Sequence, residues 1–131
     1  MWVLLGVFVI FDLFMLSFVI ISRSRKTFNE ADKIKYSRIW DGIVKMGDRR
    51  HAVMEADKLL YELMDKKGYK GTLGEKLKKA GPGFGNLNEV WSAHKLRNRL
   101  AHEMGAGLSE REAENALLSF KRAYRDLGLK L

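Results

Sequence analysis

The stretch SEREAENALLSFKRAYRDLG, residues 109–128, has the pattern of an amphipathic α-helix with both of its ends marked. Ser109 and Glu112 are spaced as a capping box, in which each side chain binds the backbone N–H of the other residue, and Gly128 is a typical helix stop. Apolar side chains recur every three or four residues and so share one face: Ala113, Ala116, Leu117, Phe120, Ala123, Tyr124 and Leu127. The stretch therefore predicts a helix packed inside an all-α domain.

The sequence before this stretch repeats the helical pattern, and none of it alternates apolar and polar residues with the period of two that strands show. Thr72 and Glu75 form a second capping box, which predicts a short helix over residues 73–79. A long helix is expected from Asn86 to about Glu103. Another long helix is indicated by apolar residues that share one face: Ile39, Ile43, Met46, Val53, Leu60 and Met64. We expect a bundle of three long helices and one short one.

The N-terminal segment WVLLGVFVIFDLFMLSFVII, residues 2–21, is apolar except at Gly6, Asp12 and Ser17. Twenty helical residues span about 30 Å, the thickness of the hydrocarbon core of a bilayer. Basic residues follow at once, and the positive-inside rule then places the C-terminal side in the cytoplasm: Arg23, Arg25 and Lys26. The sequence predicts a single-pass protein of the inner membrane with the bilayer as a partner. The predicted parts are a transmembrane signal-anchor helix (1–22), a basic polar linker (23–38) and the helical bundle (39–131).

Composition and charge limit the kinds of partner that the chain can bind. Residues 23–131 hold all 24 Lys and Arg residues and 15 of the 16 Asp and Glu residues, which gives a formal net charge of +9. This balance suits an RNA ligand and equally suits an anionic inner leaflet. The absence of cysteine excludes a disulfide framework and thiolate chemistry. Asp12, in the middle of the apolar segment, is interpreted either as a contact with a partner helix or as a tolerated, protonated acid.

The segment WSAHKLRNRLAHE, residues 91–103, brings polar side chains onto an apolar face. At about 100° per residue, His94, Asn98 and His102 lie at roughly 0°, 40° and 80° around the helix axis. Arg97 lies at about −60°, on the other side of the same face. Polar groups that face inward cost about 1–3 kcal/mol each unless they are hydrogen-bonded. This helix is therefore predicted to carry the functional site.

A purely structural interpretation of these polar groups is open. In it, Arg97 pairs with Asp57 or with Glu103, and the histidines bind neighbouring backbone carbonyls. Both acids are within the predicted bundle. Asp57 is on the preceding long helix, and Glu103 is at the end of the helix that carries Arg97. Under this interpretation the residues hold the fold together and carry no chemistry.

The motif RNRLAH, residues 97–102, resembles the Arg-polar-x-x-x-His signature of HEPN domains, the nucleotide-binding or RNase domains of toxins and defence systems. It opens with Arg97 and Asn98, closes with His102, and lies on the penultimate helix of a small α bundle. The preceding long helix with its EADKLL segment and the final amphipathic helix also fit the family. The resemblance covers about residues 39–128 and implies a HEPN-like bundle.

What the resemblance implies is RNA cleavage without a metal or cofactor, at a symmetric dimer interface where two copies of the motif face one cleft. His102 would act as general base or acid on the ribose 2′-hydroxyl, since a histidine exchanges protons near neutral pH. Arg97 would hold the phosphate and its growing charge. Asn98 would orient His102 from one turn away. His94 and Asp57 have no fixed counterpart in the pattern and are weaker candidates for ligand binding.

Three functions are consistent with the sequence. The first is a membrane-anchored HEPN-like module that binds RNA, a nucleotide or a protein partner on the cytosolic side. The alternatives are a metal-independent endoribonuclease and a non-catalytic membrane-anchored helical scaffold. Many HEPN-like domains are non-catalytic, so the resemblance leaves open whether the chain is an enzyme. A homodimer is predicted through the Trp91/Asn98 face, because Leu96 and Leu100 can supply that helix's contacts with its own bundle.

Overall fold

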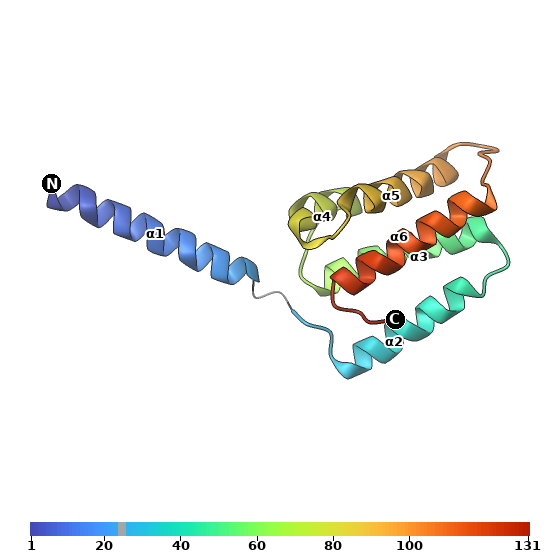
Figure 1. The fold of residues 1–131 in the computed structure, drawn as a ribbon, viewed down its shortest axis with the longest axis horizontal. Helices are drawn as coiled ribbons and strands as arrows, with labels where there is room; N and C mark the ends of the chain where they lie inside the picture. The colour runs from blue at the N-terminus through green and yellow to red at the C-terminus, as the bar shows by residue number, and fades with distance from the viewer. Residues whose placement is uncertain (24–25) are drawn as a thin grey trace.

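The computed structural model describes residues 1–23 and 26–131, with side chains at 1–17 and 26–131. These residues contain helices and no strand: α1 (Trp2–Arg23), α2 (Glu30–Val44), α3 (Arg49–Lys66), α4 (Leu73–Ala80), the 3-10 turn η1 (Gly81–Gly83), α5 (Leu87–His102) and α6 (Glu110–Asp126). Figure 1 shows α2 to α6 gathered into a bundle, with α1 apart from it. The predicted all-α class is confirmed for this part of the chain.

The structure corrects the predicted transmembrane anchor. Within the described ranges, no helix is both long enough and apolar enough to cross a membrane. The predictions of a transmembrane helix, a single-pass membrane protein and an inner-membrane location are therefore wrong. The partner helix expected at Asp12 stays a prediction.

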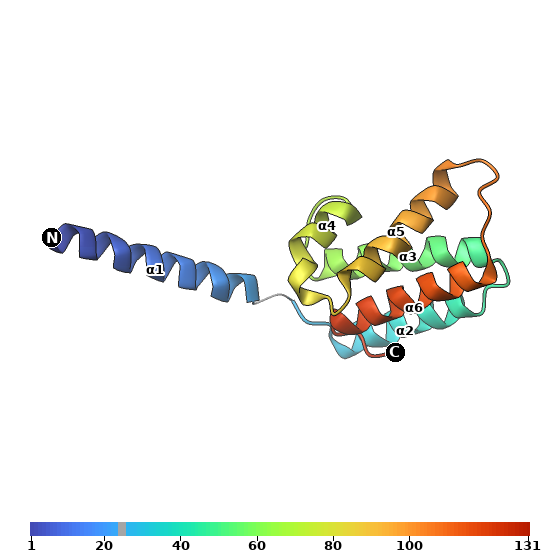
Figure 2. The ribbon, with the colours of Figure 1, turned by 45° about the horizontal axis from the view of Figure 1, so that its top comes forward.

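Helix α6 packs against both α3 and α5 (Figure 2). Its inward face is the predicted one, and all of its members are buried: Ala113, Ala116, Leu117, Phe120, Ala123 and Tyr124. Ser109 and Glu112 form the predicted capping box at its N-terminus. Gly128 follows its C-terminus with φ +103°, a conformation that glycine adopts without steric cost. The pattern that predicted this helix is therefore confirmed at both ends.

The bundle begins earlier than residue 39. Asn29 caps α2 by accepting a hydrogen bond from the Asp32 N–H, and the Asp32 side chain accepts one from the Asn29 N–H. Phe28 packs edge-on against Tyr36, with ring centroids 5.9 Å apart, and both rings are buried. Part of the segment predicted as a linker is thus core, because these two rings join the apolar face of α2.

The long helix expected from residue 39 to about residue 68 is two helices in the structure. The chain leaves α2 after Val44, and the Met46 N–H donates to the Ile43 carbonyl in a tight turn. Asp48 then caps α3 by accepting a hydrogen bond from the His51 N–H. The apolar spacing continues through the turn, which is why periodicity alone did not detect the break. The bundle accordingly has four long helices and one short one.

Helix α4 is fixed to α3 by a buried lysine. The Lys76 side chain is fully buried, and its Nζ lies 3.3 Å from the centre of the Tyr61 ring. Nζ also lies 3.3 Å from Asp65 Oδ1 and donates to the Tyr61 carbonyl at 3.4 Å. The ammonium is thus surrounded by a ring face, a carboxylate and a carbonyl, which offset the cost of removing it from water.

Candidate functional site

Helix α5 carries the polar side chains that the sequence singled out, which we call the polar stripe: His94, Arg97, Asn98 and His102. Asn86 caps it by accepting a hydrogen bond from the Glu89 N–H. The helix packs against α3 and α6, and its buried residues are Val90, Ala93 and Leu100. The side chains of His94, Arg97 and Asn98 are only partly exposed, so these three lie in the packed region beside α3.

Asp57 of α3 is the acid that meets this stripe. Its side chain is 7% exposed, and its Oδ1 lies 2.7 Å from Nδ1 of His94, whose side chain is 12% exposed. Its other oxygen, Oδ2, lies 3.5 Å from Nε of Arg97. Each carboxylate oxygen therefore faces one side chain of α5. The pair of Arg97 and Asp57 is one of the two ion pairs that the structural interpretation predicted.

Asn98 closes these contacts into a ring of four side chains. Its Nδ2 lies 3.4 Å from Nε2 of His94, and its Oδ1 accepts a hydrogen bond of 3.2 Å from Nη1 of Arg97. We name Asp57, His94, Arg97 and Asn98 the polar ring. Among the described residues, the guanidinium thus makes one hydrogen bond, from Nη1 to Asn98, and an ion pair with Asp57, while its buried Nε has no hydrogen-bond partner.

Two aromatic residues support the polar ring. The Tyr124 hydroxyl donates a hydrogen bond of 2.6 Å to the carbonyl of Ala56, the residue before Asp57. Burial, and then the neighbouring charge of Asp57, hold the pKa of Tyr124 well above its ordinary value, so the hydroxyl stays a donor. The Trp91 ring meets His94 edge-on, with centroids 6.0 Å apart. The imidazole is therefore held by a carboxylate, an amide and an indole.

Arg50 of α3 secures the C-terminal end of α5, a role that sequence reasoning missed. Its Nη1 donates to the Leu100 carbonyl at 2.9 Å, and its Nη2 donates to the Ala106 carbonyl in the loop that follows. Leu100 is one of the last four residues of α5, whose carbonyls have no N–H partner further along the helix. The only sequence signal was that Arg50 falls among the apolar residues of its stripe.

His102 is exposed and is the last residue of α5. No hydrogen bond or ion pair joins it to Asn98 in the described part of the chain; the Asn98 amide binds His94, one turn in the opposite direction. Arg97 and His102 are five residues apart, which on a helix is about 7.5 Å along the axis and about 140° around it. Arg97 belongs to the polar ring, whereas His102 is at the end of the helix, and within one chain the two side chains do not converge on a common point.

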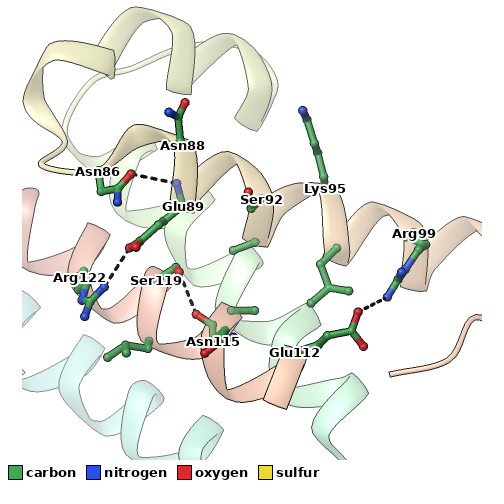
Figure 3. Close-up of a pocket in the computed structure, with 14 residues that line it drawn as sticks. Asn86, Asn88, Glu89, Ser92, Lys95, Arg99, Glu112, Asn115, Ser119 and Arg122 are labelled. Carbon is green, nitrogen blue, oxygen red and sulfur yellow. Dashed lines mark hydrogen bonds and ion pairs between the residues drawn. The ribbon is translucent and has the colours of Figure 1, made fainter. Parts of the chain in front are cut away.

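A groove lies on the other side of α5, between α5 and α6, with a volume of about 910 Å³ (Figure 3). Arg99 pairs with Glu112 at 3.1 Å near one end, and Arg122 pairs with Glu89 at 3.0 Å near the other. Hydrogen bonds from Ser109 and the charge-assisted bond from Arg99 lower the pKa of Glu112. Both arginines of the groove are thus neutralised by acids, whereas Lys95 extends away from them into the open (Figure 3).

The described ranges contain no group of three or more His, Cys, Asp or Glu side chains arranged to hold a metal ion.

Comparison of the chain with protein-family models, with curated proteins and with solved structures finds no match. The likeness to HEPN domains therefore rests on the motif at residues 97–102 and its position on α5, and it stays a prediction.

Proposed function

We propose that the bundle binds RNA through its phosphate backbone, with Arg97 as the principal contact and His102 at the edge of the site. The observation that carries the proposal is how Arg97 is held. Its Nε faces Asp57 and its Nη1 donates to Asn98, while 31% of the side chain reaches solvent. Nη2 has no hydrogen bond to another of the described residues, so a pre-oriented donor is left for a ligand. A planar guanidinium held in this way suits a phosphate.

The charge of the bundle supports an anionic ligand. Residues 26–131 contain 22 Lys and Arg residues against 15 Asp and Glu residues, a formal net charge of +7. Several of the basic side chains on the surface have no acidic partner among the described residues, for example Lys58, Lys95 and Arg111. An excess of unpaired positive charge attracts a polyanion at long range and makes binding weaken as salt is added.

Binding alone accounts for this geometry better than cleavage does. Cleavage at one phosphate requires a proton acceptor and a charge-stabilising group at the same atoms. Arg97 and His102 of one chain point in directions about 140° apart, and the amide that should orient His102 binds His94 instead. An endoribonuclease would need the two groups to come from two chains. RNA incubated with the chain in chelator stays intact if the site only binds, and acquires new ends if it cuts.

The proposal is tested with the full chain and a short fluorescein-labelled single-stranded oligouridine, by fluorescence anisotropy at two salt concentrations. Arg97→Ala is expected to weaken binding by roughly tenfold or more, since a charge-assisted contact is worth about 1.5–3 kcal/mol. Arg111→Ala removes the same charge from an exposed position on α6 and serves as the matched control. Equal losses in the two variants would mean that only net charge matters. Absence of binding by the wild type would leave the helical scaffold as the better account.

A further inference from the structure

The Trp91 side chain is fixed in place next to the polar ring. It meets His94 edge-on, with ring centroids 6.0 Å apart and an angle of 62° between the two planes. Helix α4 also approaches it: a methyl group at Gly74 would lie 3.5 Å from Cη2 of Trp91, an ordinary van der Waals distance. The indole packs against the core and is only partly buried. It is thus held by its neighbours while part of it stays at the surface, where another flat ring can reach it.

Two positively charged side chains lie on either side of Trp91 around α5. By helix geometry, Lys95 is about 40° to one side of Trp91 and about 6 Å along the axis, and Arg97 is about 120° to the other side and about 9 Å along it. Lys95 is exposed, extends into the open and pairs with no acid among the described residues (Figure 3). The Arg97 side chain is 31% exposed. An aromatic ring at the surface therefore has two cations within a separation comparable to the length of a nucleotide.

We propose that the RNA is single-stranded, with one base stacked on Trp91 and the neighbouring phosphates held by Lys95 and Arg97. The inference rests on the proposed function and adds to it the class of RNA and a contact with a base. The bases of a duplex are paired and stacked on one another, whereas an unpaired base can stack on an aromatic side chain. Such stacking tolerates any sequence, because every base has a π-face. The site therefore selects single strands and accepts many sequences.

Charge favours RNA over a second copy of the chain as the occupant of this surface. A second copy that packs on Trp91 would bring two more positive side chains to the surface, and like charges repel. A phosphate instead neutralises Lys95 and Arg97, the two cations that are already there. RNA is therefore expected to compete with self-association through the same indole.

The test compares two labelled strands of equal length: the short single-stranded oligouridine and a strand with the same sugar–phosphate backbone that carries no bases. The full chain should bind the oligouridine at least about fivefold more tightly, the effect expected of one stacked base. Lys95→Ala and Arg97→Ala should each weaken both strands alike, because each removes a phosphate contact. Trp91→Leu should weaken the oligouridine alone, and Trp91→Phe should keep most of the difference. Trp2→Leu removes an indole that is 87% exposed on α1 and, as the matched control, should change neither affinity.

Each outcome separates this inference from the proposed function. Equal wild-type affinities for the two strands, both weakened by Arg97→Ala, would overturn the base contact and keep the proposed function. A Trp91→Leu variant that loses both strands equally would overturn the base contact too, because the indole would then support the bundle only. Absence of binding to either strand would refute the proposed function and this inference with it.

NMR of the ¹⁵N-labelled full chain checks the contact directly through the indole Nε–H signals. The Trp91 signal should shift when oligouridine is added and should shift much less with the base-free strand. The Trp40 signal serves as the control and should stay in place, since that ring is buried in the core. A Trp91 signal that is unmoved at saturating oligouridine, or that moves equally with the two strands, would overturn the stacking.

Discussion

Nδ1 of His94 lies 2.7 Å from Oδ1 of Asp57, and through this contact two nearly buried polar side chains join α5 to α3. The sequence separates them by 37 positions. Their contact explains how α5 can carry polar residues on its packed side, since each group finds a partner where it leaves water. The contact between Asn98 and His94 depends on it, because this carboxylate orients the imidazole that Asn98 binds.

Removal of the Asp57 charge should destabilise the bundle strongly. Asp57→Ala removes the hydrogen-bond partner of His94 and the ion-pair partner of Arg97, and breaking a buried charged pair typically costs about 3–5 kcal/mol. The measurement is the free energy of unfolding in urea. Asp41→Ala, at an exposed position of α2, is the control and should change it by less than about 0.5 kcal/mol. Similar values for the two variants would contradict a structural role for Asp57.

Loss of the Tyr124 hydroxyl should have a smaller effect of the same sign. Tyr124→Phe keeps the ring packed against Trp40, whose centroid is 5.4 Å away, and leaves the buried Ala56 carbonyl without this donor. Ala56 is in the interior of α3, so its carbonyl keeps its helical partner and the loss is that of one hydrogen bond, about 0.5–1.5 kcal/mol. Tyr61→Phe, at a residue that is 42% exposed, is the matched control and should be close to neutral. The two variants are compared by thermal and urea unfolding.

Local signals were enough to predict the starts of α4, α5 and α6. The capping boxes at Thr72 and Ser109 involve residues three positions apart, so the sequence alone shows both partners. The turn between α2 and α3 was missed because the apolar spacing runs through it, although Asp48 after Gly47 is a usable capping signal. The early start of the bundle was missed because Phe28, Ile34 and Tyr36 stand among many charged residues in the segment 23–38.

Acid should weaken the bundle through Asp65. Its hydrogen bond with Lys76, and then the charges of Lys76 and Lys70, lower its pKa below the ordinary value of 3.8. A pKa that is lower in the folded state gives stability that is present above the ordinary value and is lost as the pH falls through the folded one. Asp65→Asn should therefore lower the melting temperature at neutral pH, with the difference from wild type shrinking in acid. A difference that stays constant down to the lowest pH would contradict this linkage.

Self-association through the Trp91/Asn98 face is expected to be measurable. Leu100 is buried and Leu96 packs against the core of its own bundle, whereas Trp91 keeps part of its ring at the surface. Sedimentation equilibrium of the full chain at micromolar concentration should show a dimer that Trp91→Arg weakens. Leu118→Arg, at a 47% exposed residue lining the groove on the other side of α5, should not affect it. A monomer at all concentrations would refute the dimer.

The site could be predicted only in part. The residues of the polar stripe follow from helical spacing, and Asp57 was one of two acids expected to pair with Arg97. The acid that pairs with Arg97 is determined by how α3 and α5 pack. The spacing of residues within one helix does not specify that packing. Asn98 binds His94 and not His102 for the same reason. Only His94 lies against α3, where the Asp57 carboxylate fixes its ring.

The most direct test of the account is an NMR titration of the full chain, ¹⁵N-labelled at arginine, with the short single-stranded oligouridine, following the Nε–H signals. Arg97 is predicted to shift most, because its side chain is held open to a phosphate beside the polar ring. Arg99, two residues along α5 and paired with Glu112 in the groove, should move little. Shifts that concentrate at Arg99 and Arg122 would place the ligand in the groove, and an Arg97 signal unmoved at saturating RNA would contradict the account.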